Sequence, residues 1–404
     1  WIGAWWFCRN PEEAMRETLA WARRTSGKDV ILGFQGGATV EPRAEMCPAG
    51  GAPAIREIAS WKVSRMVEAI TAGASEIAAV MVEPLMTRYG LIPLESDAVA
   101  TVAEARQLHD QGVRLFVVNA PAQSLETLAE AMPDSLLINA GSPDDELRTS
   151  RCLGNVLHTL PSRSMLADAL GQFLALRRWN RWLLISGPTE EDQAYAEALK
   201  RAAKRFGHKI IEEKPWSFDN DQRRTAQADM PLFTQAGEYD VVVVADERGD
   251  FGEYVPYHTW LPRPVVGTQG LIPTGWHKTV ETYGAAQLQK RFETHAHRWM
   301  NDRDFAAWIG VRSLATAITK LGATDPLAIR QISLSESLPV DGFKGRKLTF
   351  RPWNGQLRQP IPLVHPRGLV SNSPQDGFLH PTSELDTLGF DRPESQCRLS
   401  EAKS

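Results

Sequence analysis

Short apolar runs alternate with amphipathic stretches along most of the chain, most clearly between positions 181 and 248. Arg181–Ser186 is an apolar run, Glu190–Phe206 has the periodicity of a long helix, and Asp240–Ala245 is a second apolar run. Such alternation predicts the strands of a parallel sheet with helices on both faces. Both runs end in polar loops, and ligands of open α/β sheets bind at the carboxyl ends of strands. The pattern therefore predicts an α/β fold and the edge at which a binding site would lie.

The alternation continues on both sides of this stretch. Further strands are predicted over Val113–Val118, Leu136–Ile138, Val156–Leu160, Lys209–Glu212 and Pro262–Gly267. Helices are predicted over Asp97–Gln111, Ser124–Met132 with Ser124 as a possible N-cap, Ser164–Arg177, Gln287–Trp299 and Asp304–Leu321. Because two sets of strand–helix units join near Pro161, we expect two lobes of similar architecture.

The first 92 residues are harder to interpret, because no single periodicity organises them. Helices are plausible over Pro11–Arg24 and Trp61–Ala72, a strand over Val30–Phe34, and either a strand or a helix over Ile77–Leu85. The chain opens on Trp1 without a basic or apolar leader, so we expect a mature or truncated form.

Composition limits the class of protein and its partners but does not indicate a function. The 404 residues are 43% hydrophobic and 23% charged, as in an ordinary soluble protein with room for two domains. The net charge of -4 gives no support for a nucleic-acid partner. The four cysteines show no metal-type spacing. Cys152 and Cys397 lie in polar, loop-like sequence, where either one disulfide or two free thiols would fit.

The sequence does not indicate an enzyme. It contains no nucleophile elbow, zinc-protease motif, phosphate-binding loop or dinucleotide fingerprint. His295 and His297 are two residues apart in a predicted helix, so they point to different faces and do not form a metal pair. The acids at 190–192 follow Thr189, and an N-cap with acids in the first helical turn explains that cluster.

Binding is better supported, by loops after the predicted strands. The loop Asp246–Phe251 carries Arg248, whose planar donor fork suits carboxylates. The next loops carry Trp260, Trp276 and His277 among Pro and Gly residues. Arg, His and Trp together suit an anionic, flat or aromatic ligand. The alternative is a surface loop with its aromatic side chains packed beneath it.

At this point the sequence resembles a known family. Residues 95–399 look like the type I periplasmic substrate-binding proteins of ABC transporters, in the branched-chain amino-acid-binding branch, and Ala306–Ala317 is similar to a helix late in those chains. Further segments resemble a subfamily found with alcohol oxidation that depends on pyrroloquinoline quinone (PQQ). These segments are Asn139–Asp145, Leu157–Ser162, Gly187–Thr189, Gly377–His380 and Glu384–Cys397.

The resemblance implies two Rossmann-like lobes, joined by a hinge, that close on a ligand in the cleft between them. It implies a first lobe over 93–161 with 285–345 returning to it, a second lobe over 162–284 with 346–380, and a tail over 381–404. Residues 1–92 stand in the place of the family's first βαβ unit and do not match it. The family also implies export to the periplasm, and with it a Cys152–Cys397 disulfide.

The implied site and function follow from the loops. Asn119, Asn139 and Ser142 of one lobe would face Thr189, Arg248 and Trp276 of the other, with Trp260 and His277 beside them. The chain would be a monomer without a cofactor of its own that binds PQQ, or a compound linked to PQQ-dependent oxidation, and delivers it to an ABC permease. The alternatives are a branched-chain amino-acid-type binding protein and a ligand sensor or chaperone with the same fold.

Overall fold

The computed structural model describes residues 98–216, 223–335 and 337–399, together with five short strands between residues 30 and 93. The chain divides into two compact units, Trp1–Thr101 and Val102–Ser404.

In the first unit, three strands form a parallel sheet in the order β2-β1-β3: β1 (Val30–Phe34), β2 (Ala54–Ile58) and β3 (Ile77–Val80). A two-residue pair, β4 (Leu85–Met86) and β5 (Ile92–Pro93), runs antiparallel. The strand predicted at Val30–Phe34 is confirmed, and Ile77–Val80 is a strand rather than a helix. The helices predicted over Pro11–Arg24 and Trp61–Ala72 lie outside the described residues.

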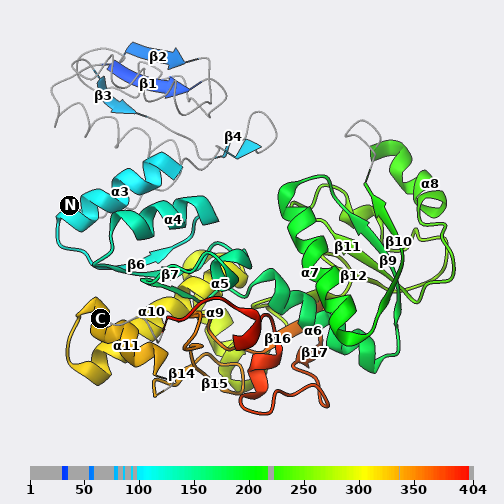
Figure 1. Ribbon diagram of the computed structural model, residues 1–404. Helices are drawn as coiled ribbons and strands as arrows, with labels where there is room; N and C mark the ends of the chain where they lie inside the picture. Colours follow the sequence, from blue (N-terminus) through cyan, green and yellow to red (C-terminus); the bar gives the residue numbers. More distant parts are fainter. Residues whose placement is uncertain are drawn as a thin grey trace. The chain divides into compact units, whose positions relative to one another are not determined.

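The second unit contains two separate parallel sheets, each the centre of a lobe (Figure 1). The first lobe has the strand order β6-β7-β8, with β6 (Leu115–Val118), β7 (Leu136–Asn139) and β8 (Val156–His158). The second lobe has the order β10-β9-β11-β12, with β9 (Arg181–Ser186), β10 (Lys209–Pro215), β11 (Val241–Ala245) and β12 (Val265–Gly267). The parallel strands predicted from the apolar runs are confirmed. Most have the predicted bounds or shorter ones, whereas β7 and β10 extend past their predicted ends to Asn139 and Pro215.

Helices flank both sheets. They are α3 (Ala98–Asp110), α4 (Ala122–Ala131), α5 (Glu146–Thr149), α6 (Arg163–Leu176), α7 (Glu190–Phe206), α8 (Arg223–Phe233), α9 (Ala285–Ala296), α10 (Asp302–Leu321) and α11 (Pro326–Leu334). Short 3-10 turns occur at Gly252–Tyr254, Thr282–Gly284, Glu384–Thr387 and Arg392–Glu394. Among the described residues, no helix is long and apolar enough to cross a membrane.

Two local predictions were wrong. Ser124 is not an N-cap, because Pro121 with its extended ψ of 162° precedes the helix and α4 begins at Ala122; Ser124 lies buried inside the helix. His297 is not helical, because α9 ends at Ala296 and His297 caps it in a left-handed conformation with φ 55°. The predicted cap at Thr189 is confirmed, and Asp192 completes a capping box there.

Three further pairs of strands come from the last third of the chain. A small antiparallel sheet joins β13 (Ile272–Pro273), β16 (Ile361–His365) and β17 (Gly368–Ser373), while β14 (Val340–Asp341) pairs with β15 (Lys347–Leu348). The β13-β16-β17 sheet packs on α6 of the second lobe. Between β15 and β16 the chain returns to the first lobe, where the Leu357 amide donates to the His158 carbonyl at 2.8 Å. The C-terminal third therefore contributes to both lobes.

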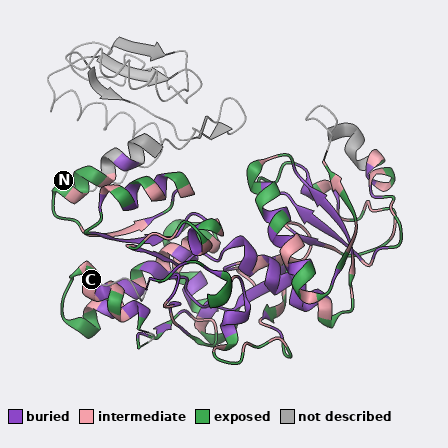
Figure 2. Ribbon diagram, in the orientation of Figure 1, coloured by how far each residue is buried: buried purple, intermediate pink, exposed green. Residues whose placement is uncertain are grey.

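Each lobe has its own apolar core, and the sheets are buried in both (Figure 2). In the second lobe, Trp182 together with Val241 and Val243 of β11 packs against α6 and α7. In the first, Ile138 of β7 packs against Ile309 of α10. Gly310 permits this close approach, since a Cβ there would lie 2.8 Å from the Ile138 Cγ2 atom.

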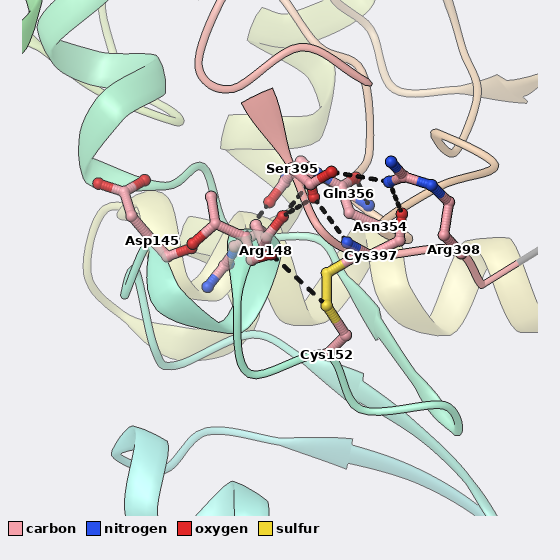
Figure 3. The surroundings of a disulfide bond; sticks show 9 residues. Asp145, Arg148, Cys152, Asn354, Gln356, Ser395, Cys397 and Arg398 are labelled. Carbon is pink, nitrogen blue, oxygen red and sulfur yellow. Dashed lines mark hydrogen bonds between the residues drawn. A yellow bond between two sulfur atoms is a disulfide. The ribbon is translucent and has the colours of Figure 1, made fainter. Parts of the chain in front are cut away.

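A disulfide ties the end of the chain to the first lobe (Figure 3). Cys152 follows α5 and is bonded to Cys397, with Cα atoms 5.5 Å apart, which is the pairing that the family resemblance implies. Hydrogen bonds continue the attachment: the Gln396 amide donates to the Thr149 carbonyl at 2.8 Å, and the Ser395 hydroxyl donates to the Arg148 carbonyl at 2.8 Å. The tail is thus part of the folded body up to Leu399.

Candidate functional site

A cavity of about 560 Å³ lies at the carboxyl ends of β11 and β12 and is lined from both lobes. We call it the interlobe cavity. Its walls are formed by Pro143, Leu160, Pro161, Leu166, Tyr195, Asp246–Gly249, Gly267–Gln269, Ile272–Gly275 and Asn301–Arg303. The volume is in the range of small-molecule sites, and the position is where parallel α/β sheets bind ligands.

Two arginines line the cavity. The Arg248 side chain is 62% exposed, and its Nε atom lies 3.8 Å from an oxygen of Asp250, a long and weak ion pair. Arg303 is exposed in the first turn of α10, and no ion pair joins its side chain to another described residue. The amino end of α10 adds a partial positive charge at the same wall. Arg248 and Arg303 therefore remain available to a ligand carboxylate.

Two of the carboxylates that line the cavity are committed to the protein itself. The buried Asp246 accepts hydrogen bonds from the backbone amides of Asp250, Phe251 and Gly252, at 2.9, 3.0 and 2.6 Å. These bonds fix the conformation of the loop after β11, in which the Arg248 side chain is exposed. Glu247 accepts from Arg163, so its charge is already neutralised. Asp302, half-buried, is the remaining acid of the wall.

Tyr195 of α7 supplies a neutral polar group. Its side chain is buried at the cavity wall, and its hydroxyl makes no hydrogen bond to another described residue. Burial, with Glu247 nearby, raises the pKa of the Tyr195 phenol above its usual value, so the hydroxyl stays protonated. A protonated phenol can donate to a ligand oxygen or accept from a ligand amine.

Arg163 connects the lobes beside the cavity. Its Nε and Nη2 atoms donate to both Glu247 oxygens at 2.8 Å, and Nη1 donates to Asp144 of the first lobe at 2.6 Å. Although burial opposes it, the hydrogen bond from Ser142 and the charge of Arg163 keep the pKa of Asp144 below its usual value. Asp144 is therefore ionised at neutral pH and the bridge is intact.

Buried polar side chains hold the chain segments that cross between the lobes. Arg148 donates to Gln356 Oε1 at 3.0 Å and to the Leu160 carbonyl at 3.2 Å, which links two of these segments. Lys344 donates to the Gly275 carbonyl and to Gln359 Oε1, at 2.5 and 2.6 Å. The crossing segments thus form one hydrogen-bonded hinge region.

Of the residues that the sequence proposed for the site, the structure places Arg248 on the cavity wall. Thr189 is engaged as the cap of α7. Asn119 is exposed at the end of β6, where it packs so closely on Gly141 that a Cβ at Gly141 would lie 2.7 Å from its Oδ1 atom. Asn139 and Ser142 are buried: Asn139 accepts from the Ser142 amide at 2.9 Å and so shapes the loop after β7.

Arg248 is the one proposed residue among those that line the cavity, and the last three proposed residues, like Asn119, Asn139, Ser142 and Thr189, lie outside its lining. Trp276 is buried against Phe305, with ring centroids 4.6 Å apart, and its Nε1 donates to Gln289. Trp260 is half exposed in the loop before β12. The His277 imidazole is 2.8 Å from the Thr279 hydroxyl, and burial lowers its pKa. The structure adds Tyr195 and Arg303, which sit in helices whose sequence pattern gave no sign of a site.

Comparisons with known proteins identify the fold. No family model matches the chain, and no curated protein matches it in sequence. Solved structures do match it. A branched-chain amino acid ABC transporter periplasmic ligand-binding protein from Burkholderia xenovorans has a TM-score of 0.64 at 13% identity, over 92% of this chain and 99% of that one.

Two other solved structures are similar to this chain in fold. A periplasmic binding protein from Burkholderia mallei has a TM-score of 0.58 at 13% identity, over 92% of this chain and 99% of that one. A solute-binding protein of an ABC transporter from R. palustris, solved with benzoate, has a TM-score of 0.53 at 12% identity, over 85% and 94%. The chain therefore has the two-lobed fold of type I periplasmic binding proteins, as the family resemblance predicts.

Proposed function

We propose that this chain is the solute-binding component of an ABC transporter, acts in the periplasm as a monomer and delivers its ligand to a permease. The observation that carries the proposal is the interlobe cavity, where two exposed arginines and a protonated phenol converge from different elements. The fold supports it, and the Cys152–Cys397 disulfide is consistent with an oxidising compartment. We also propose the lobe boundaries implied by the family resemblance, with the segment between β15 and β16 assigned to the first lobe because the Leu357 amide donates to the His158 carbonyl.

For the ligand we propose a small carboxylate of amino-acid size. Arg248 and Arg303 would bind its carboxylate, and Asp302 could accept from an amine. The apolar part would contact Leu160, Leu166 and Ile272. Tyr195 is the one aromatic side chain among the described lining residues, so stacking on a flat ring has little support here. PQQ, a flat tricarboxylate, is a second candidate that rests on the subfamily resemblance and on the two arginines.

Calorimetric titration with leucine, benzoate and PQQ tests these assignments. Leucinol, which lacks the carboxylate, is the matched neutral compound for leucine. Binding of leucine but not leucinol would support the amino-acid assignment, whereas tight binding of PQQ alone would replace it. The absence of heat and of any rise in melting temperature with all three compounds would contradict both ligand assignments, the small carboxylate and PQQ.

Arg248→Ala tests the cavity itself. If Arg248 makes a charge-assisted contact, its loss should weaken binding of the carboxylate ligand by about 1.5–3 kcal/mol. Arg367→Ala, an exposed arginine on the turn between β16 and β17 that does not line the cavity, is the matched control. Unchanged affinity in Arg248→Ala would place the ligand elsewhere.

A further inference from the structure

Another hollow, of about 800 Å³, lies on the second lobe and shares no lining residue with the interlobe cavity. Its walls come from the end of α6, the loop at 256–264, the edge strand β12 and the hairpin β16–β17. We call it the edge groove. Because β12 is the last strand of the order β10-β9-β11-β12, the groove follows the outer edge of that sheet.

The walls of the edge groove are largely aromatic and aliphatic. Phe173 and Trp179 meet edge to face, with centroids 6.4 Å apart and planes at 80°, and Val265 and Leu271 continue the apolar surface. Tyr257 is 91% exposed and holds a left-handed backbone with φ 70°. Residues other than glycine seldom adopt a left-handed backbone conformation. In Tyr257 this conformation occurs together with a side chain that is almost wholly exposed to solvent. Flat apolar walls of this kind suit a planar ring.

The permanently charged groups of the groove are two arginines. Arg177 is exposed, and its guanidinium carbon lies 5.2 Å from the centroid of the Phe173 ring, so the fork is held beside the aromatic wall. Arg263 is exposed on the opposite segment. Neither side chain makes an ion pair with another described residue, and His365 adds an imidazole.

Acidic groups are missing from the wall. Among the described residues that line the edge groove there is no Asp or Glu. The carboxylate of Glu238 interacts electrostatically with Arg263, but it is hydrogen-bonded to Arg181 at 2.8 Å. Arg177 and Arg263 therefore have carboxylate-binding capacity that the described residues do not use.

We propose that the edge groove is a second ligand site, for a planar aromatic carboxylate, independent of the interlobe cavity. Its volume is that of a small-molecule site, and its lining joins a mostly apolar wall to a few polar groups of one sign, as such sites do. The ring would lie against Trp179 and Tyr257, and the carboxylate would accept from Arg177 or Arg263. The proposal does not depend on the transport function.

Calorimetry with 2-naphthoate tests the site, with 2-naphthylmethanol as the neutral compound of the same shape. Naphthoate should bind the wild type more tightly than the alcohol. Arg177→Gln and Arg263→Gln together should weaken naphthoate by at least about tenfold, since charge-assisted hydrogen bonds are lost. Tyr257→Ala should weaken both compounds. Arg367→Gln, on the same hairpin as His365 but outside the groove, should change neither.

Three outcomes would overturn the proposal. One is the absence of naphthoate binding to the wild type at millimolar concentration. Another is equal affinity in the wild type and the double arginine variant. The third is loss of naphthoate binding in Arg248→Ala with retention in the double variant, because the compound would then occupy the interlobe cavity. All four positions are exposed, so the variants should keep the wild-type circular dichroism and melting temperature.

Discussion

His158 lies at the end of β8 with its imidazole fully buried between the sheet and the hinge region. The Asn139 Nδ2 atom lies 3.0 Å from the Nδ1 atom of His158 and can only donate, so Nδ1 accepts and the neutral ring carries its proton on Nε2. Burial, and then the nearby Arg148, hold the pKa of His158 well below its ordinary value of 6.5. The folded protein therefore keeps this ring uncharged under conditions in which the unfolded chain protonates it.

The sign of the pH effect follows. Below about pH 6.5 the unfolded state binds one proton that the folded state does not, so stability should fall as the pH falls. Below pH 6.5 the unfolding free energy should therefore decrease by up to about 1.4 kcal/mol per pH unit because of this residue. His158→Gln cannot titrate, so its urea-unfolding free energy should depend less steeply on pH by that amount. If both proteins have the same slope, His158 is charged in the folded state and this interpretation fails.

Single residues also show what sequence can and cannot reveal about the site. Arg248 could be predicted, because a charged loop follows an apolar strand and such loops face ligands in this class of sheet. Trp276 could not, because an indole in a Gly- and Pro-rich loop looks the same whether it packs inward or outward; here Phe305 covers it. Tyr195 was missed because its helix has an ordinary amphipathic pattern, and only the approach of the neighbouring loops makes it part of a cavity.

At the scale of elements, Thr189 at the start of α7 has two candidate roles, helix cap and ligand contact, and substitutions can distinguish them. Its hydroxyl accepts from the Asp192 amide at 3.2 Å, and Asp192 also accepts from the Glu247 amide at 2.7 Å, so the cap supports the loop that carries Arg248. Thr189→Ala should cost about 1 kcal/mol of unfolding free energy, as lost caps do. Thr189→Ser retains the hydroxyl and should stay near wild type. A large loss of ligand affinity in Thr189→Ala without loss of stability would instead place the hydroxyl on the ligand.

The tail of the chain offers a second prediction at this scale. The disulfide closes a loop with a sequence separation of 245 residues, which restricts the unfolded chain strongly. Replacing both cysteines by serine should lower the unfolding free energy by about 2–4 kcal/mol, measured by urea titration. Wild-type protein treated with reductant should match the double variant. Equal stability of all three would mean that the hydrogen bonds of Ser395 and Gln396 hold the tail by themselves.

Elements were the level at which the sequence was most informative. The apolar runs located the strands of both lobes, since fully buried parallel strands leave an unmistakable pattern. The segments that cross between the lobes could not be recognised from the sequence. Their conformation depends on hydrogen bonds between distant residues, such as Arg148 with Gln356, and no local periodicity encodes such bonds. The same is true of the return of Leu357 to His158, which completes the first lobe from the far end of the chain.

For the whole molecule, the bridge from Arg163 to Asp144 and Glu247 is the contact that most directly couples the lobes beside the cavity. The Arg163 side chain is 5% exposed, while its two acidic partners are 33% and 24% exposed. Breaking a fully buried pair costs about 3–5 kcal/mol, because the partner charge is left unpaired; partial exposure of these acids reduces that penalty. Arg163→Gln should therefore lower the unfolding free energy by about 2–3 kcal/mol.

Asp144→Asn is the matched comparison, since it removes the link to the first lobe but leaves the two bonds between Arg163 and Glu247. It should destabilise the protein less than Arg163→Gln. If the bridge also sets how the lobes sit, both variants should change the radius of gyration in small-angle scattering, and addition of ligand should reverse the change because closure brings the loops together again. If both variants give scattering curves identical to wild type, Arg163 contributes only to local stability. The arrangement of the lobes would then be fixed by the hydrogen bonds of Arg148 and Lys344 in the hinge region.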